Sequence, residues 1–273
     1  MRAKMKKAIT KYYRIKSNKI TKADFPIRVV FISDLHNVDF GKNNEVLLDK
    51  IDSLSPDLVL LGGDTIIGKP QKDMEIGLDF IKQLGARWQI YAANGNHEYR
   101  LKIYPDTYNG MYERYLETIQ VAGVTLLENE KTSVTIKESQ VVIHGLEIER
   151  QYYGRLKKEE LSSDDVKKYL GAIEDENYHI MLAHNSRYGQ AYMEWGADLT
   201  LCGHYHGGII RLPKELPLIG NDFQLFPKYG YGHYLSEGKH LITSAGIGEH
   251  TIPLRINNPR ELVVVDIINK NNK

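Results

Sequence analysis

Cysteine is nearly absent from this sequence: one residue among 273, so no internal disulfide can form. That scarcity fits a reducing compartment. Long apolar runs are also absent, because no segment approaches the roughly 20 residues of a membrane span. The N-terminal region lacks the apolar core of about 7–15 residues found in signal peptides. These absences predict a cytoplasmic protein, unless an N-terminal anchor has been removed.

Internal repeats, low-complexity tracts and linkers are missing as well. Hydrophobic residues make up 42% and charged residues 26%, which is ordinary for a globular protein. A chain of this length buries a sizeable core without disulfide or metal staples. We therefore expect a single domain over residues 25–268, preceded by residues 1–24 as a basic leader or first strand.

Acidic residues are missing from residues 1–22, which contain nine Lys or Arg. The rest of the chain has 27 basic and 35 acidic residues, a net charge of about −8. We favour a solvated leader that runs into a first strand. The alternative is a basic arm that contacts nucleic acid or anionic lipid, the latter as a peripheral membrane contact.

Short apolar runs alternate with helical patterns from Phe25 onward. Strands are expected at 26–34, 57–64 and 88–96, with helices at 43–54 and roughly 70–84 between them. This alternation is typical of a mainly parallel sheet covered by helices.

The pattern changes after residue 124. Antiparallel strands are expected at 124–130, 131–139 and 140–148. A helix at 162–174, opened by Ser162 or Ser163, precedes strands at 178–184, 198–204, 240–248 and 261–268. One domain with two sheets is the simplest interpretation.

Five of the expected strands end in polar side chains that can bind metal. They are Asp34 and His36, then Asp64, then Asn96, then His184, and finally His204 and His206. The carboxyl ends of strands in an open α/β sheet form one crevice, so these side chains should meet. Carboxylate and imidazole suit Mn, Fe, Zn or Ni. Seven ligands exceed one site and fit two metals about 3.5–4 Å apart that share a carboxylate.

Each motif alone also has a structural explanation. A polar strand terminus accounts for Asp-x-His, and a turn accounts for Gly-Gly-Asp. Asp34 and His36 are spaced by two, which on an extended chain end points both to one face. All five motifs in this order, each after a buried strand, favour a metal centre over a series of turns.

The order Asp-x-His, Gly-Asp, Gly-Asn-His-Glu, His, Gly-His-x-His resembles the calcineurin-like metallophosphoesterase superfamily, from about Ile27 to Ile267. "GHYHGGIIRLP" and "SAGIGEHTIPLRINNP" are most similar to its bacterial, YkuE-like branch. The resemblance implies an α/β (α+β) fold, a four-layer α/β/β/α sandwich of two mixed sheets flanked by helices.

The resemblance also implies two ligand sets that share a bridging Asp64. One metal would bind Asp34, His36, Asp64 and His206, and the other Asp64, Asn96, His184 and His204. The implied reaction is in-line attack on phosphorus by a metal-bound hydroxide, with Mn favoured and Fe, Zn or Ni compatible. His97 would protonate the leaving oxygen, and Glu98 would orient the ligands.

Other residues are candidates for substrate contacts. Asn37 either binds a substrate phosphate or caps a turn, which we favour. His233 and His250 lie in late Gly-rich loops that the family folds back toward the site, and Arg255 follows in "PLRI". Cys202 is interpreted as a small strand residue behind the metals rather than as a ligand.

Tyrosines follow the third motif directly. They are Tyr99, Tyr104, Tyr108, Tyr112 and Tyr115. The last three share one helical face, which favours core packing. The alternative is an aromatic wall, with Tyr99 nearest the metals, on which a base or sugar stacks.

The leading hypothesis is a dinuclear metal hydrolase that acts on a small phosphodiester, pyrophosphate or phosphomonoester. "TIIGKP" after Asp64 lacks the Arg of protein Ser/Thr phosphatases, a strong phosphate clamp, which argues against a phosphoprotein substrate. A nuclease acting on DNA or RNA is one alternative, weakened by the acidic body. A non-catalytic binding module is another, but it predicts eroded ligands, and the ligands are retained.

Overall fold

The computed structural model describes residues 7–21, 25–154, 159–220, 224–249 and 254–271. Two six-stranded mixed sheets form the centre of the molecule. The first has the order β1 (Ala8–Ser17), β14 (Arg260–Asn269), β2 (Ile27–Ile32), β3 (Leu58–Leu61), β4 (Ile90–Ala92) and β5 (Thr125–Leu126). The second has the order β12 (Gly232–Ser236), β13 (Lys239–Thr243), β9 (Leu199–Gly203), β8 (Tyr178–Asn185), β7 (Ser139–Leu146) and β6 (Glu130–Ile136).

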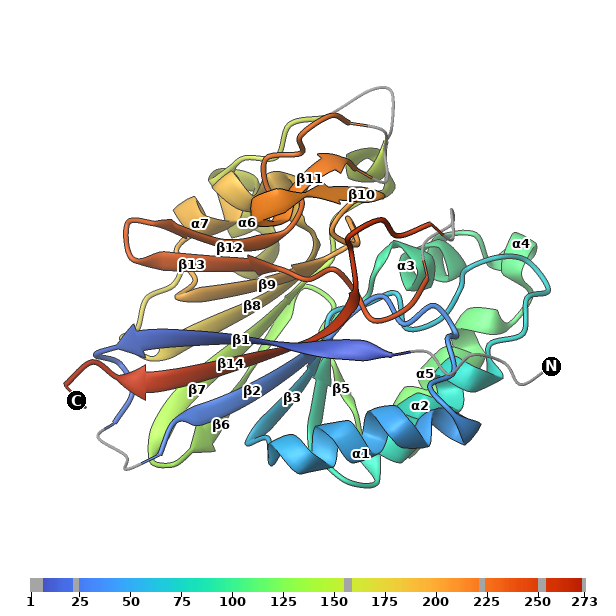
Figure 1. Cartoon of the computed structure of the whole chain (residues 1–273), viewed down its shortest axis with the longest axis horizontal. Helices are drawn as coiled ribbons and strands as arrows, with labels where there is room; N and C mark the ends of the chain where they lie inside the picture. Colours follow the sequence, from blue (N-terminus) through green and yellow to red (C-terminus); the bar gives the residue numbers. More distant parts are fainter. Residues whose placement is uncertain (1–6, 22–24, 155–158, 221–223, 250–253, 272–273) are drawn as a thin grey trace.

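Helices cover the outer face of each sheet (Figure 1). The first sheet is covered by α1 (Glu45–Leu54), α2 (Glu75–Gly85) and α5 (Met111–Val121), and the second by α6 (Ser163–Leu170) and α7 (Gly189–Trp195). Two short helices, α3 (Asn96–Ile103) and α4 (Pro105–Tyr108), connect β4 to α5. Short 3₁₀ turns occur at Lys42–Asn44, Arg150–Tyr153, Ser186–Tyr188 and Pro213–Glu215. The expected four-layer α/β/β/α sandwich is confirmed.

Alternating side chains along the strands divide the core into layers. In β2, Val29 and Phe31 face the second sheet, whereas Val30 and Ile32 face the helices. The same alternation in β9 sends Leu201 between the sheets and Cys202 toward α6 and α7. Because both faces of these strands are buried, they read in the sequence as continuous apolar runs.

Some strands and helices end earlier than the sequence predicted, at residues whose backbone φ is positive. The strand expected at 26–34 ends at Ile32, because Asp34 and His36 have φ of 56° and 48°. The helix expected at 162–174 is capped by Ser162 but ends at Leu170, where Gly171 follows with φ of 76°. Left-handed backbone ends both strands and helices.

One pairing prediction was wrong. The segment 124–130 was expected to be antiparallel to its successors, but β5 pairs in parallel with β4 in the first sheet. The chain crosses to the second sheet after Leu127, and only β6 and β7 form the antiparallel pair. The period-2 pattern of a two-residue strand is too short to indicate its partner.

The basic N-terminal segment contributes a strand of the first sheet. Residues 8–17 form the edge strand β1. They lie within residues 1–24, which we predicted to be a basic leader or first strand. Strand β1 runs parallel to β14 from Ala8 beside Arg260 to Ser17 beside Asn269. No helix in the described part of the chain is long and apolar enough to span a membrane.

Candidate metal centre

The candidate metal ligands lie at or just after the carboxyl ends of strands from both sheets, at one end of the sandwich. Tight turns with left-handed backbone position most of them. Five of the seven candidate metal ligands have a positive φ, between 48° and 69°. They are Asp34, His36, Asp64, His204 and His206. The extended-chain explanation for the Asp-x-His spacing is therefore wrong. Left-handed backbone, unusual for residues other than glycine, brings these side chains together.

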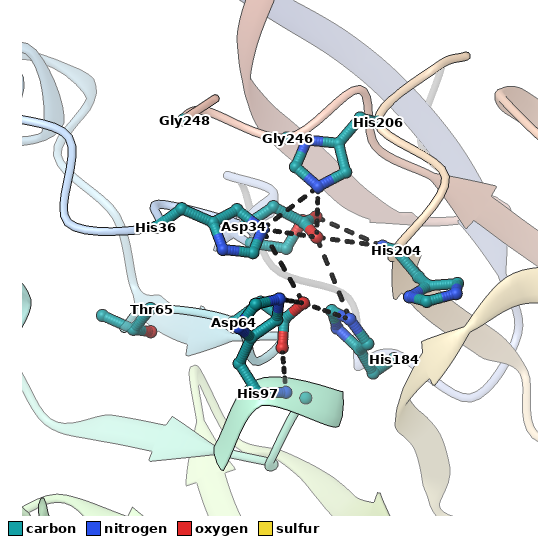
Figure 2. Close-up of polar contacts among 12 residues, drawn as sticks. Asp34, His36, Asp64, Thr65, His97, His184, His204, His206, Gly246 and Gly248 are labelled. Atoms are coloured by element: carbon teal, nitrogen blue, oxygen red, sulfur yellow. Dashed lines mark hydrogen bonds and ion pairs between the residues drawn. The ribbon is translucent and has the colours of Figure 1, made fainter. Parts of the chain in front are cut away.

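Asp34, His36 and His206 form one group of potential ligands (Figure 2). Nε2 of His206 lies 3.2 Å from Oδ1 of Asp34 and 3.1 Å from Nε2 of His36. The other carboxylate oxygen of Asp34 accepts a hydrogen bond from the Ser33 hydroxyl at 2.7 Å. Asp34 is fully buried, and its Oδ1 is directed at the imidazoles.

Asp64, His184 and His204 form a second group. Nε2 of His184 lies 3.1 Å from Oδ2 of Asp64, and Nδ1 of His184 lies 2.7 Å from the Gly62 carbonyl. Because a carbonyl only accepts, Nδ1 carries a proton, and Nε2 is the ring nitrogen that faces Asp64 and would bind a cation after losing its own proton. A carbonyl in this position commonly orients histidine ligands of metals.

Asp64 lies between the two groups. Its Oδ1 accepts a hydrogen bond from the His97 amide at 2.7 Å, which fixes the carboxylate. Its Oδ2 lies 3.7 Å from Nε2 of His36, which belongs to the first group, and 3.1 Å from Nε2 of His184. One carboxylate oxygen therefore faces imidazoles from both groups.

Three observations show that these residues fit a bound cation. The buried Oδ1 of Asn96, at the start of α3, has no hydrogen-bond partner among the described residues. Burial alone would raise the pKa values of Asp34 and Asp64, yet the surrounding histidines hold both low. Burial opposes protonation of His184, but Asp64 and Asp34 outweigh it and raise its pKa to about 10. The buried carboxylates of Asp34 and Asp64 are therefore stable only with positive charge beside them, which a bound cation would provide.

Glycines allow the backbone to approach the carboxylates closely. A Cβ at Gly203 would lie 2.4 Å from Oδ2 of Asp34, and one at Gly95 would lie 2.2 Å from Oδ1 of Asp64. Side chains at these two positions would displace the carboxylates.

Glu98 organises the loop that holds Asp64. Its fully buried carboxylate accepts hydrogen bonds from the amides of Asp64, Thr65 and Gly95 at 2.8–3.0 Å, and from Ile66 at 3.2 Å. Burial and the neighbouring Asp64 raise its pKa to about 7, against the effect of these bonds. Glu98 does not reach the two ligand groups, and it acts through the backbone of Asp64.

His97 lies at the margin of the cluster. Its Nε2 is 3.9 Å from Oδ2 of Asp64, and its ring meets that of His36 edge-on. The Gly68 amide donates to its Nδ1 at 2.8 Å, so the neutral ring carries its proton at Nε2. Burial, together with the cation of Arg100, lowers its pKa to about 4.

The candidates for substrate contacts have separate locations. The side-chain amide of Asn37 donates to the Asp73 carbonyl, in the segment before α2. Tyr99 lies near Glu147 and the Arg150 backbone. His233 stacks on His240 beside Tyr13 on β1, so the structure does not bring it to the cluster. His250 lies outside the described residues.

Arg255 does lie beside the cluster. One of its guanidinium nitrogens is 3.3 Å from Nδ1 of His206 and donates to the Gly248 carbonyl at 2.8 Å. The other donates to the Ala245 carbonyl at 2.8 Å. Arg255 thus holds the loop around Gly246 against His206.

Sequence reasoning missed Tyr153. The ring of Tyr153 meets that of His204 edge-on, with 5.5 Å between centroids. "QYYG" carries no pattern that marks it as a neighbour of a metal ligand. Tyr108 and Tyr115 are buried in the core under the first sheet, as the favoured core interpretation predicted.

The comparisons with known proteins agree with this geometry. The family model described as calcineurin-like phosphoesterase matches residues 27–208. The chain is 26% identical to phosphodiesterase YaeI of Escherichia coli over 89% of this chain and 83% of that one. It is 25% identical to the uncharacterized metallophosphoesterase YkuE of Bacillus subtilis, over 96% and 86%. An uncharacterized metallophosphoesterase of Aquifex aeolicus is 26% identical over 95% and 92%.

The chain belongs to the calcineurin-like phosphoesterase family. The matched segment includes every residue of the two ligand groups. This calcineurin-like phosphoesterase is accordingly a metal-dependent phosphoric ester hydrolase, and the expected similarity to YkuE is confirmed.

Replacing Glu98 with Gln should weaken metal binding. A glutamine amide nitrogen cannot accept hydrogen bonds, so at least two of the four amides lose their acceptor and the Asp64 loop shifts. We expect metal affinity to fall by about 10–100-fold, as for other partners that orient metal ligands. Isothermal titration calorimetry of the metal-free protein with the metal measures this affinity. Glu113→Gln, on the exposed face of α5, is the matched control; equal affinities for the two variants would contradict the role of Glu98.

Replacing Cys202 with Ser should leave the metal content unchanged. Cys202 is completely buried and faces the layer of α6 and α7, and burial raises the pKa of its thiol well above the usual value. It therefore does not provide a thiolate to the ligand groups. Elemental analysis of the purified variant checks this, and loss of one metal equivalent would restore Cys202 as a ligand.

Proposed function

We propose that this calcineurin-like phosphoesterase uses a two-cation centre to hydrolyse a small phosphodiester, pyrophosphate or phosphomonoester. The observation that carries the proposal is the position of Asp64 between two groups of ligand atoms. Within each group the atoms lie within 4.8 Å of one another. That spacing matches the distances at which side chains surround a single ion.

The proposal assigns four residues to each cation, with Asp64 in common. One set is Asp34, His36, Asp64 and His206, and the other is Asp64, Asn96, His184 and His204. When bound, the cations lower the pKa of water and stabilise negative charge on the phosphoryl oxygens. Mn is favoured, and Fe, Zn or Ni suit the same nitrogen and oxygen donors.

His97 is proposed to assist departure of the leaving oxygen by donating a hydrogen bond to it from Nε2–H. The Gly68 amide occupies Nδ1, so the proton is held at Nε2, on the side of Asp64. His97 is proposed not to bind metal, although it lies within ligand distance of His36 and Asp64. Its Nδ1 is engaged and its Nε2 carries hydrogen, so the neutral ring has no free lone pair to offer.

The side chains around the proposed cation sites support the choice of substrate class. The described loop after Asp64 has no Arg, and Arg255 is engaged by three backbone carbonyls. Neither is available as the guanidinium clamp that a phosphorylated protein side chain would need. The similarity to a protein named phosphodiesterase YaeI supports a diester as the preferred substrate.

A substrate panel tests the proposed function. The metal-free protein is reconstituted with Mn, Zn, Fe or Ni and assayed with bis-p-nitrophenyl phosphate, p-nitrophenyl phosphate, cyclic nucleotides and UDP-sugars. We expect turnover of the diester with two equivalents of metal, because both ligand groups must be filled. Maximal turnover at one equivalent would contradict the two-cation centre, and a metal-loaded protein inactive on every substrate would favour a binding module.

His97→Ala should lose turnover while it retains metal. Loss of a positioned group that assists the leaving oxygen typically lowers the rate by about 10²–10⁴-fold. The loss should be larger for phenyl esters than for p-nitrophenyl esters, whose leaving group needs less assistance. His204→Ala is the comparison variant and should lose metal. Metal loss in His97→Ala itself would show that His97 is a ligand.

A further inference from the structure

A small sheet follows directly after the last two ligand histidines. Strands β10 (Ile210–Leu212) and β11 (Leu216–Ile219) pair in antiparallel fashion. Ile256 forms a bridge with Ile210 on one side, and Leu225 forms a bridge with Ile219 on the other. The small sheet lies beside the end of the sandwich where the metal centre is located (Figure 1).

One face of this small sheet consists of aliphatic side chains. Directly paired residues place their side chains on the same face, and the pairs here are Ile210 with Ile256, Ile210 with Ile219, Leu212 with Leu216, and Ile219 with Leu225. We call these six residues, with the flanking Leu254 and Phe226, the apolar face.

The apolar face is exposed. Among the described residues, fourteen large hydrophobic side chains are exposed, and six of them belong to it. Leu225 is 64% exposed and Leu216 is 47% exposed. Isolated exposed hydrophobics need no explanation, but a contiguous group indicates an interaction surface.

The opposite face of the same segments is polar and buried. Arg211, between Ile210 and Leu212, is 3% exposed and its guanidinium lies over the Tyr231 ring. Arg255, between Leu254 and Ile256, reaches His206. Strand alternation therefore separates an inward face that supports the metal centre from an outward face that nothing in the described chain covers.

The N-terminal strand begins at the margin of the apolar face. Ile9 of β1 lines one pocket together with Leu212, Pro213 and Pro259. The sequence immediately before it contains four positive charges and no negative charge, at Arg2, Lys4, Lys6 and Lys7. Along β1, Lys11 pairs with Glu215, the nearest described acid beside Leu216. The described chain thus begins at Lys7, close to the apolar face, and the residues that precede Lys7 in the sequence include three basic and no acidic ones.

We propose that the apolar face docks on the surface of a bilayer that contains anionic phospholipids. Aliphatic side chains would enter the boundary between headgroups and acyl chains, and the basic N-terminal residues would bind the negative headgroups. A second copy of the chain fits less well, since self-association about a two-fold axis would bring two basic segments together. Apart from Phe226, the face also lacks the aromatic residues, Met and Arg that enrich the cores of protein interfaces.

Docking by this face brings the metal centre close to the bilayer surface. Leu254 and Ile256 have exposed side chains, and Arg255 between them contacts His206 on the inward side. The docking site lies beyond residues 27–208, the segment that matches the family model, so it is a feature outside the shared metal-binding part.

Vesicle flotation tests the proposal without any measurement of turnover. The full chain is mixed with phosphatidylcholine vesicles that contain 0 or 30% phosphatidylglycerol. We expect binding only to the anionic vesicles. The double variant Leu216→Gln/Leu225→Gln should reduce the partition coefficient by about tenfold or more, because both side chains leave the lipid phase. The control Val121→Gln/Leu235→Gln changes two exposed apolar residues on α5 and β12, 74% and 63% exposed, and should bind as the unmodified protein does.

Further variants measure the contribution of the basic residues to vesicle binding and test whether the apolar face instead binds a second copy of the chain. Replacing Arg2, Lys4, Lys6 and Lys7 with Gln should weaken binding and its dependence on salt. His204→Ala should bind vesicles normally, so failure of the metal chemistry and failure of docking are distinguishable. The proposal is overturned if the unmodified protein does not float with anionic vesicles, or if both double variants bind equally. A dimer in sedimentation velocity that only Leu216→Gln/Leu225→Gln dissociates would instead make the face a protein interface.

Discussion

The metal centre depends on left-handed backbone at five residues that are not glycine. A side chain in this conformation costs of order 1–3 kcal/mol unless surrounding structure compensates. Here the compensation is a ladder between two adjacent loops, in which the amides of Asp34 and His36 donate to the carbonyls of Gly63 and Asp64. The turn after β2 and the turn after β3 therefore hold each other in the strained form. Glu98 completes this arrangement from α3 by accepting the amides that follow Gly63.

The centre also depends on how the two sheets pack. Asp34, Asp64 and Asn96 leave strands of the first sheet, whereas His184, His204 and His206 leave strands of the second. The carboxylates and the majority of the imidazoles therefore come from opposite layers. They meet only because the inner apolar core, with Phe31 and Leu201 among its members, fixes the separation and twist of the sheets. Interior packing far from the ligands thus determines their geometry.

The sequence predicted the parts of the molecule that are recorded in local patterns. Buried strands such as 178–184 and the polar residues at their ends were recognisable, because hydrophobic runs and chemically distinctive side chains are both local. The pairing of β5, the small β10–β11 sheet and the contact between Tyr153 and His204 were not. Each is set by long-range packing in which short segments with no periodicity take positions left by larger elements. Arg255 is intermediate: its identity was noticed, but its role in holding the loop at Gly246 requires coordinates.

The segment 254–256 shows how one short extended stretch serves two surfaces. Because side chains alternate, Leu254 and Ile256 face outward while Arg255 faces the centre. Both backbone polar groups of Ile256 bind the segment around Ile210, since its amide donates to the Ile209 carbonyl and its carbonyl accepts from the Arg211 amide. The segment that carries the outward side chains therefore also positions Arg255 against His206.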